Sequence, residues 1–424
     1  MNIQLEKGHS HVAMNVPGHK IADVLLGKKV TAVGLEVLTK KMRESLKVDL
    51  PHDITTKKIA VLIPDDTRLW ARGDVFVSEI VKTLLSIGVP PENICVIIAL
   101  GTHADMEQTK FPILAGDFAV ETIQIFNSAN KNQKRLVSFG KTTRQTDLYF
   151  TKEASSADHI IIFGGVLHHM LAGYGGGRKY IFPGIAGYES IQQNHSLAML
   201  PEGGAHPKVR QTELAGNPVH EDIQEAAEIF LEGKGCTYVG VTANGQGEIF
   251  HVEVGGLEEA FSKSCVKLDE ACCLFIEDKL DFALISAGGH RADGQLYQST
   301  KALFNGVCAV KEGGRILFVA ECADGIGNPI FESALRKYHN DPETLGRELV
   351  TSFNMPSYVA YRVIDLLNRF QITLLSGLSK QETCELGFKF IENSEIYVNN
   401  LTGKGYIIPF AENILPIVRM AEER

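Results

Sequence analysis

Short, continuously hydrophobic runs alternate with polar and amphipathic stretches along the first half of the chain. Residues 58–64, 93–100 and 159–163 form such runs, which is the pattern of strands buried on both faces. Between the first two runs, apolar residues recur at helical spacing across 78–87. Strands and helices in this alternation predict a parallel sheet that is covered by helices.

The pattern resumes after a change of composition between residues 265 and 280. The further elements that we expect are helices at 257–264, 297–310 and 356–370 and strands at 282–286, 315–320 and 372–375. A chain of 424 residues also exceeds what one hydrophobic core usually organises. The sequence therefore predicts an α/β protein with two α/β domains, mainly parallel sheets and an interdomain cleft.

We place an N-terminal α/β domain at 1–270 and a C-terminal α/β domain at 275–404. The last twenty residues include a short apolar run at 406–409 and then a stretch with helical character. We expect this C-terminal tail, 405–424, to pack on the N-terminal domain.

Composition narrows the class of partner. A net charge of −9 argues against a nucleic-acid partner, because phosphate binding needs a clustered excess of Lys and Arg. No run approaches the length of a membrane span, and the N-terminal residues show no signal-peptide pattern. The eight cysteines include no Cys-x-x-Cys pair, so we expect reduced thiols in a cytoplasmic protein.

Reactive side chains follow three of the expected strands. Asp65 and Arg68 follow the first, His103 the second and His169 the third. Each has an ordinary explanation, since Arg68 can pair with a neighbouring Asp and a histidine after a strand is more often structural. Because the carboxyl ends of parallel strands meet at one edge of a sheet, their convergence favours a ligand site there.

A glycine-rich segment ends in a lysine. Gly175, Gly176 and Gly177 allow close backbone approach to a ligand, and Lys179 follows two residues later. The segment resembles a phosphate loop but lacks the Gly-Lys-Ser/Thr ending. A nucleotide-dependent kinase or ligase is therefore a weaker alternative, and a plain turn is the commoner meaning of such glycines.

Two further positions carry candidate chemistry. His195 offers a nitrogen ligand suited to nickel, copper or zinc, but no nearby carboxylate or cysteine completes a protein-only site. A solvated histidine at a helix end is an equally good interpretation. In the C-terminal domain, Gln298 and Lys301 lie three apart on one helix face, next to Tyr297. They are candidates for substrate binding or are simply exposed polar residues.

Taken in order, these pieces resemble the lactate racemase family. The resemblance extends over residues 58 to 305, and any one motif is weak whereas the set is specific. The motifs are Asp-x-Thr-Arg at 65–68, Gly-Thr-His at 101–103, His169 ten positions before Lys179, Gly-Gly-x-Lys at 176–179, Pro-Gly-Ile-Ala-Gly at 183–187, Asn-His-Ser at 194–196, Gly-Asn-Pro at 216–218 and Tyr-Gln-Ser-x-Lys-Ala at 297–302.

The resemblance implies a nickel-pincer nucleotide, a pyridinium mononucleotide whose sulfur and carbon donors hold nickel. It implies a covalent thioamide bond from this cofactor to Lys179, and it makes His195 the remaining nickel ligand. The implied cofactor-binding residues are Gly175, Gly176, Gly177 and Asp65, of which Asp65 would also orient a neighbouring catalytic group. Partner proteins would then be those of cofactor biosynthesis.

The implied reaction inverts C2 of a small 2-hydroxy acid by hydride transfer. His103 and His169 would be the two acid/base groups, one for each hand of the substrate. Arg68 would hold the substrate carboxylate with two hydrogen bonds. Tyr297, Gln298 and Lys301 would complete substrate binding. The cofactor performs the hydride chemistry, and the protein orients the substrate.

Several residues depart from the family pattern around this site. Trp70 follows Leu69 where a proline is expected, His168 precedes His169, and Tyr174-Gly175 replace an aromatic-Ser pair. Trp70, His168 and Arg72 either shape the substrate pocket or pack within the fold, and packing is favoured for Trp70.

The substrate is therefore open between lactate and a larger 2-hydroxy acid such as gluconate or malate. A non-catalytic nickel or cofactor carrier is a further alternative, although a carrier has no need of two histidine bases. The sequence does not determine an oligomeric state.

Overall fold

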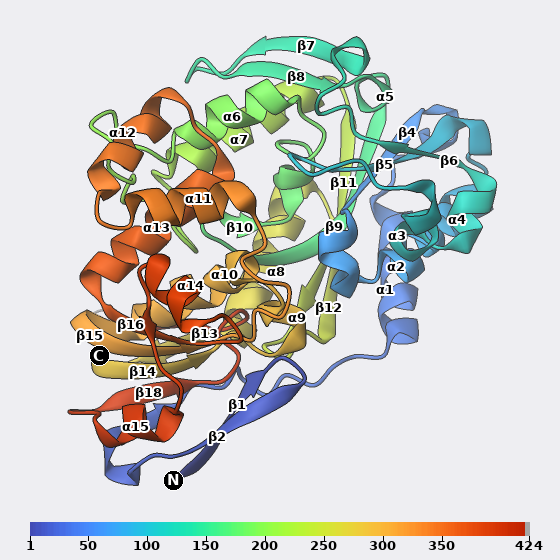
Figure 1. Cartoon of the computed structure of the whole chain (residues 1–424). Helices are drawn as coiled ribbons and strands as arrows, with labels where there is room; N and C mark the ends of the chain where they lie inside the picture. The colour runs from blue at the N-terminus through green and yellow to red at the C-terminus, as the bar shows by residue number, and fades with distance from the viewer. Residues whose placement is uncertain (420–424) are drawn as a thin grey trace. The chain divides into compact units, whose positions relative to one another are not determined.

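The computed structural model describes residues 1–419, and the chain divides into two compact units (Figure 1). The central unit consists of Val30–Ala198 and His206–Asp269. The terminal unit consists of Met1–Lys29, Met199–Ala205 and the described residues from Glu270 on. Both units are α/β with mainly parallel sheets, as the sequence predicts.

The central unit is built on a seven-stranded sheet with the strand order β12-β11-β9-β4-β5-β6, and β10 also pairs with β9. Neighbouring strands from β11 to β6 run parallel, whereas β12 and β10 are antiparallel to their partners. The strands are β4 (Ile59–Ile63), β5 (Ile94–Ile98), β6 (Gln124–Asn127), β9 (His159–His169), β10 (Gly173–Gly175), β11 (Gly235–Ala243) and β12 (Ile249–Gly255). A separate antiparallel hairpin joins β7 (Leu136–Lys141) to β8 (Asp147–Thr151).

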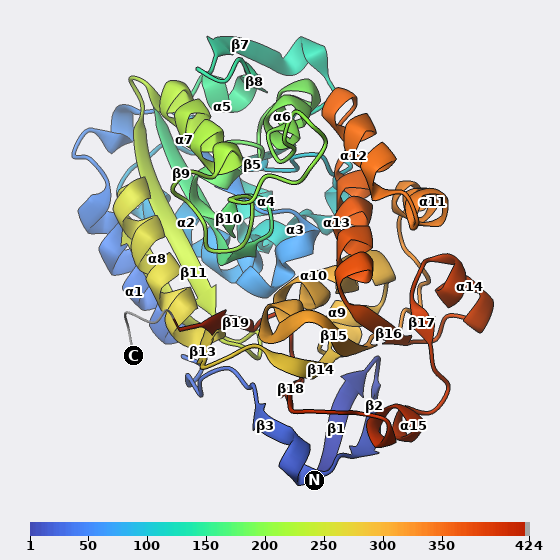
Figure 2. The same ribbon diagram turned by 90° about the vertical axis from the view of Figure 1, so that its left-hand side faces the viewer.

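Helices cover both faces of this sheet, with α1 and α2 on one face and α7 and α8 on the other (Figure 2). Alternate strand residues such as Val61, Val96 and Phe163 point into a core that includes Met42 of α1 and Phe76 of α2. The helices of this unit are α1 (Leu35–Asp49), α2 (Gly73–Ser86), α3 (Phe111–Ala115), α4 (Asp117–Thr122), α5 (Lys152–Ser155), α6 (Tyr188–Ser196), α7 (Pro218–Leu231) and α8 (Leu257–Cys272), the last of which ends beyond the boundary of the unit.

The terminal unit is built on a six-stranded parallel sheet with the order β17-β16-β15-β14-β18-β3. Its strands are β3 (Ile21–Val24), β14 (Leu280–Ser286), β15 (Val310–Val319), β16 (Gln371–Leu375), β17 (Lys389–Phe390) and β18 (Gly405–Ile408). Two small pairs accompany it, the antiparallel β1 (Asn2–Lys7) and β2 (Ser10–Asn15) and the parallel β13 (Cys273–Ile276) and β19 (Leu415–Val418). Its helices are α9 (His290–Asp293), α10 (Leu296–Gly306), α11 (Pro329–Tyr338), α12 (Pro342–Thr351), α13 (Met355–Arg369), α14 (Lys380–Glu385) and α15 (Ser394–Asn399).

Both ends of the chain differ from the expected division. Residues 1–29 belong to the terminal unit, because β3 forms the edge strand of its sheet beside β18. Residues 405–419 of the tail belong there too, and the expected helical part is the strand β19 as far as Val418. Residues 420–424 of the predicted tail lie outside the described residues. Pairing between strands almost 400 residues apart leaves no local signal in the sequence, so periodicity alone missed it.

The third strand of the first sheet is longer than the sequence predicts. β9 continues through Gly164 and Gly165 to His169, where a loop was expected. A Cβ atom on Gly165 would lie 2.2 Å from the Trp70 ring, and one on Gly164 would lie 2.1 Å from the Tyr180 hydroxyl. Glycine therefore allows two large rings to pack directly on the strand, and Trp70 has the packing role that was favoured for it.

Replacement of Gly165 by alanine tests this close packing. The new methyl group must displace Trp70, so we expect G165A to lower the free energy of unfolding by about 1–3 kcal/mol. Gly256 is the matched control, because nothing lies within 4 Å of a Cβ atom built there. Urea denaturation of the two variants measures the difference, and equal stabilities would contradict the packing described.

Candidate active site

Asp65 follows strand β4 and is the N-cap residue of the short 3-10 helix Asp66–Ala71. Its carboxylate is buried, accepts the backbone N–H of Thr67 at 3.1 Å and contacts Nδ1 of His103. Burial by itself disfavours the charged carboxylate, but the hydrogen bonds from His103 and Thr67 outweigh it and lower the pKa of Asp65. A charged Asp65 is thus fixed beside His103.

His103 lies in the loop after β5, and its ring is half exposed. Asn130 holds the loop by donating to the carbonyl oxygens of Gly101 and His103, each at 2.8 Å. Because Nδ1 faces the acceptor Asp65, the ring proton of neutral His103 belongs on Nδ1. The lone pair is then on Nε2, which is the form of histidine that accepts a proton there.

His169 lies at the end of β9. Its Nδ1 accepts hydrogen bonds, whereas Nδ1 of His103 donates one. Nδ1 of His169 accepts the backbone N–H groups of Leu171 at 3.1 Å and Ala172 at 3.3 Å. The proton of the neutral ring therefore belongs on Nε2, which lies 2.8 Å from Nζ of Lys179. If Nε2 donates, Nζ must accept with its own lone pair, and Lys179 is a neutral amine.

The surroundings of Lys179 favour the same protonation state. Burial, and secondarily the guanidinium of Arg68, lower the pKa of Lys179 to about 7. Arg68 itself donates from Nη1 to the carbonyl oxygen of Thr67 at 3.0 Å. Asp66 pairs with Lys110 instead of with Arg68. A neutral amine beside a fixed cation is a nucleophile rather than an ion-pair partner.

His195 lies in the last turn of α6 and is buried. Its Nδ1 lies 3.0 Å from Oδ1 of Asn194, an atom that can only accept a hydrogen bond. Nδ1 therefore carries the proton and Nε2 the lone pair. Burial, and secondarily Lys179, lower the pKa of His195 to about 3, so the ring is neutral and suited to bind a metal ion.

Backbone conformation and close packing within the protein explain why glycine occupies positions 176 and 177 before Lys179. Gly176 and Gly177 adopt φ values of +98° and +53°. A Cβ atom on Gly176 would lie 2.9 Å from the Gly165 carbonyl oxygen, and one on Gly177 would lie 2.5 Å from the Phe261 ring. A Cβ atom on Gly175 would meet only ordinary contacts, from 3.4 Å. The contact of these glycines with a cofactor stays a prediction.

The predicted substrate residues of the second domain lie in the terminal unit, on α10. Gln298 and Lys301 are exposed, as expected for residues three apart on one helix face. Tyr297 is partly buried, and its ring packs edge-on against Phe331 with 5.2 Å between centroids. Burial raises the pKa of Tyr297.

Two supporting residues lie beside the site: Asn217, which belongs to a motif noted in the sequence, and Asp222, which the sequence did not reveal. Asn217, the N-cap of α7, donates to the carbonyl oxygen of Leu171 at 2.9 Å and so holds the turn that contacts His169. This contact explains the Gly-Asn-Pro motif, whose role the sequence left open. Asp222 of α7 contacts Asn194 in a similar supporting position.

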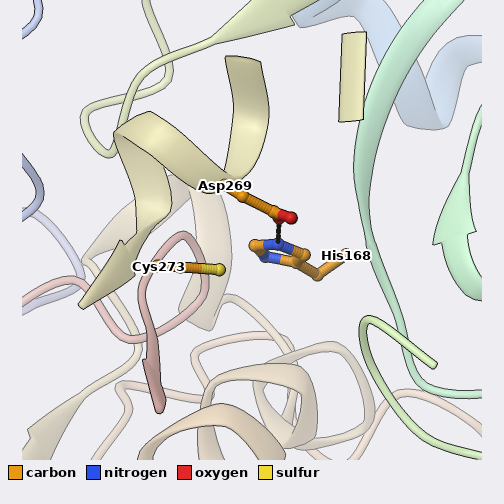
Figure 3. A group of neighbouring side chains, drawn as sticks. All are labelled: His168, Asp269 and Cys273. Atoms are coloured by element: carbon orange, nitrogen blue, oxygen red, sulfur yellow. Dashed lines mark hydrogen bonds and ion pairs between the residues drawn. The ribbon is translucent and has the colours of Figure 1, made fainter. Parts of the chain in front are cut away.

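Asp269 of α8 explains two departures from the family pattern. It accepts a hydrogen bond from His168 at 2.8 Å (Figure 3). It also accepts one from the Tyr174 hydroxyl at 2.6 Å. His168 and His169 are neighbours in a strand, so their side chains leave it on opposite faces. Asp269 thus joins the paired strands β9 and β10 to α8 on the face away from His169.

Comparison with known proteins assigns the chain to a family. The chain matches the lactate racemase N-terminal domain over residues 7–206 and the lactate racemase C-terminal domain over residues 276–385. It belongs to the lactate racemase family and is an isomerase. Membership implies a nickel-dependent cofactor.

Two lactate racemases are similar in sequence. The protein from Thermoanaerobacterium thermosaccharolyticum is 26% identical over 359 residues, which cover 82% of this chain and 81% of that one. The protein from Lactiplantibacillus plantarum is 27% identical over 307 residues, which cover 72% of this chain and 69% of that one.

Solved structures support the fold. The lactate racemase apoprotein from Thermoanaerobacterium thermosaccharolyticum has a TM-score of 0.85 at 24% identity, covering 99% of this chain and all of that one. A protein from Thermotoga maritima has a TM-score of 0.68 at 17% identity, covering 93% of this chain and all of that one. Within residues 1–419, no helix has the length and apolar character needed to cross a membrane.

The side chains of the central unit fit a covalently attached nickel cofactor. The neutral amine of Lys179 can form a covalent bond, which an ammonium group cannot. The neutral ring of His195 has its lone pair on Nε2 and can supply one nitrogen ligand. Both features come from contacts within the protein, so they exist before any cofactor binds.

Proposed function

We propose that this protein inverts C2 of a 2-hydroxy acid by hydride transfer, with a nickel-pincer nucleotide joined to Lys179 through a thioamide. The observation that carries the proposal is the hydrogen bond between His169 and Lys179, whose polarity makes Lys179 a neutral amine. Family membership supports the racemase class, and the three histidines supply the acid, base and ligand groups that this reaction needs.

In this proposal Lys179 holds the cofactor, and His195 binds its nickel through Nε2. When bound, the cofactor would supply the hydride acceptor and donor for the C2 hydrogen of the substrate. The protein supplies the remaining steps, which are to bind the carboxylate, to move the hydroxyl proton and to hold the substrate in place.

His103 has its lone pair on Nε2 and can act as a base without any rearrangement of the structure. Its Nε2 takes the substrate hydroxyl proton, and the charged carboxylate of Asp65 stabilises the imidazolium that results. Arg68, which lies close enough to lower the pKa of Lys179, binds the substrate carboxylate through two hydrogen bonds. Substrate binding by Tyr297, Gln298 and Lys301 stays a prediction from the family resemblance.

His169 is the second base. It can act only after the turn at Leu171 and Ala172, which contacts its Nδ1, has moved. With Nδ1 accepting two backbone N–H groups, the neutral ring carries its proton on Nε2 and cannot accept another there. Acylation of Lys179 removes the lone pair that receives this proton. The turn at Leu171 and Ala172 must then move away from Nδ1 before Nε2 can act as a base.

The departures from the family pattern do not favour one substrate. Trp70 packs on Gly165, Arg72 pairs with Asp74, and His168 binds Asp269. Their contacts within the protein account for all three residues. Because the two relatives in sequence are lactate racemases, lactate is our first choice, with gluconate and malate as the larger alternatives.

A panel of enantiopure 2-hydroxy acids tests the proposal. The protein is prepared from cells that make the cofactor and supply it through their biosynthesis proteins, and lactate, malate and gluconate are each offered as one enantiomer or epimer. We expect inversion of at least one substrate, with a C2 deuterium label retained in the product because hydride does not exchange with water. Chiral chromatography and mass spectrometry provide the two measurements.

The controls of this panel separate the alternatives. A K179R variant should contain no covalent cofactor and show no activity. Nickel-loaded protein that leaves every substrate unchanged would indicate a carrier, and phosphoryl transfer from ATP without nickel would indicate a kinase or ligase. Inversion with loss of the deuterium label would contradict hydride transfer.

Replacement of Asp65 by asparagine tests the role given to His103. The side-chain amide introduced by D65N can donate an N–H group to Nδ1 of His103. The ring proton of His103 then lies on Nε2, which can no longer accept the substrate proton. We expect D65N to lower kcat by roughly 100-fold to 10,000-fold, as a wrong histidine tautomer does elsewhere, with the cofactor still attached. D66N is the control, because Asp66 pairs with Lys110. Equal loss of activity in both variants would contradict a specific role for Asp65.

A further inference from the structure

A buried carboxylate lies two hydrogen bonds away from the Nδ1 atom of His195. Asp222 of α7 is fully buried. Its Oδ1 accepts the Thr142 hydroxyl at 2.5 Å, and its Oδ2 accepts the Thr146 hydroxyl at 2.7 Å and the Asn194 amide at 2.9 Å. These three partners are donors without charge, so they do not form an ion pair with the carboxylate. A buried carboxylate is costly unless its oxygens are hydrogen-bonded, and here three donors serve that purpose.

The amide of Asn194 can take only one orientation in these surroundings. Its Nδ2 donates to Asp222 at 2.9 Å and to the carbonyl oxygen of Val219 at 3.1 Å. Both partners accept and cannot donate, so a flipped amide would place Oδ1 against two oxygen atoms. Oδ1 of Asn194 therefore faces His195.

The orientation of Asn194 in turn sets the position of the proton on His195. Oδ1 of Asn194 accepts from Nδ1 of His195 at 3.0 Å. A flipped amide would present N–H groups to Nδ1 and favour the ring with its proton on Nε2. Metal ligands are commonly oriented by such outer hydrogen bonds, which fix the tautomer as well as the direction of the ring.

We propose that Asp222 is a positioning residue that fixes the Nδ1-protonated tautomer of His195 through Asn194. The relevance to nickel rests on the function proposed above, but the tautomer itself is a property of the protein without cofactor. Asp222 receives support from Thr142 and Thr146, which lie in the turn between β7 and β8. The turn of this hairpin thus helps to prepare a ligand on α6.

Nitrogen-15 NMR of histidine-labelled protein without cofactor tests the proposal. The signals of His195 are assigned by their absence in H195Q, and their shifts report which ring nitrogen carries the proton. We expect the wild type to be protonated on Nδ1. In D222A, the loss of a charge-assisted hydrogen bond should lower the ratio of Nδ1-protonated to Nε2-protonated ring by about tenfold.

T142A is the matched control, because Thr142 donates to Oδ1 of the Asp222 carboxylate, whereas Asn194 donates to Oδ2. We expect T142A to keep the wild-type ratio. N194A retains both threonine bonds to Asp222 but removes the acceptor, and it should lower the ratio at least as far as D222A does. This variant provides the test if D222A fails to fold.

An unchanged ratio in folded D222A, or in N194A, would overturn the proposal. An equal change in T142A and D222A would also overturn it, because the effect would then be a general disturbance of the buried network. If the ratio depends on Asp222 while Lys179 carries no cofactor in cells that make it, the tether is wrong but the positioning role stands.

Discussion

The hydrogen bond between Nε2 of His169 and Nζ of Lys179 determines the chemical state of the lysine in this site. Two backbone N–H groups, from Leu171 and Ala172, occupy Nδ1 and leave the ring proton on the side of the lysine. The lysine must then be a neutral amine. Asn217 holds the carbonyl of Leu171, so the start of α7 also contributes to the chemistry of Lys179.

Each of the three histidines in the site has a different neighbour that sets its ring proton. The Asp65 carboxylate determines the position of the ring proton in His103, and backbone N–H groups determine it in His169. The Asn194 amide oxygen determines it in His195. The same residue type therefore serves as a ready base, as a partner of the lysine and as a neutral ligand. The division of roles comes from hydrogen-bond polarity, which the fold imposes through the loops after β4, β5 and β9 and through α6.

Much of the fold and the site could be predicted from the sequence, because the signals are local. Continuous apolar runs marked β4, β5 and β14, and the residues after the first two strands included Asp65 and His103. What the sequence could not supply depends on contacts between distant segments. The edge strand β3 lies beside β18, and the N-terminal residues could not be assigned to the second sheet without that pairing.

The supporting residues of the site were missed for the same reason. Asp222 is separated from Thr142 by 80 positions, and Asp269 is separated from His168 by 101. Nothing in the local sequence of α7 or α8 distinguishes these carboxylates from the exposed ones around them. The glycines at 176 and 177 were predicted to make room for a ligand, yet the Phe261 ring and the Gly165 carbonyl already require them.

The reactivity of Lys179 toward an amine-acylating reagent, measured by peptide mass spectrometry as a function of pH, reports whether this side chain is a neutral amine. Its pKa of about 7 predicts that unmodified protein is acylated at Lys179 from just above neutral pH, where lysines of ordinary pKa near 10.4 remain protonated. Lys110, whose pKa Asp66 raises, is the internal control. Acylation of Lys179 only at the alkaline pH at which Lys110 reacts would contradict the neutral amine and the arrangement of His169 from which it follows.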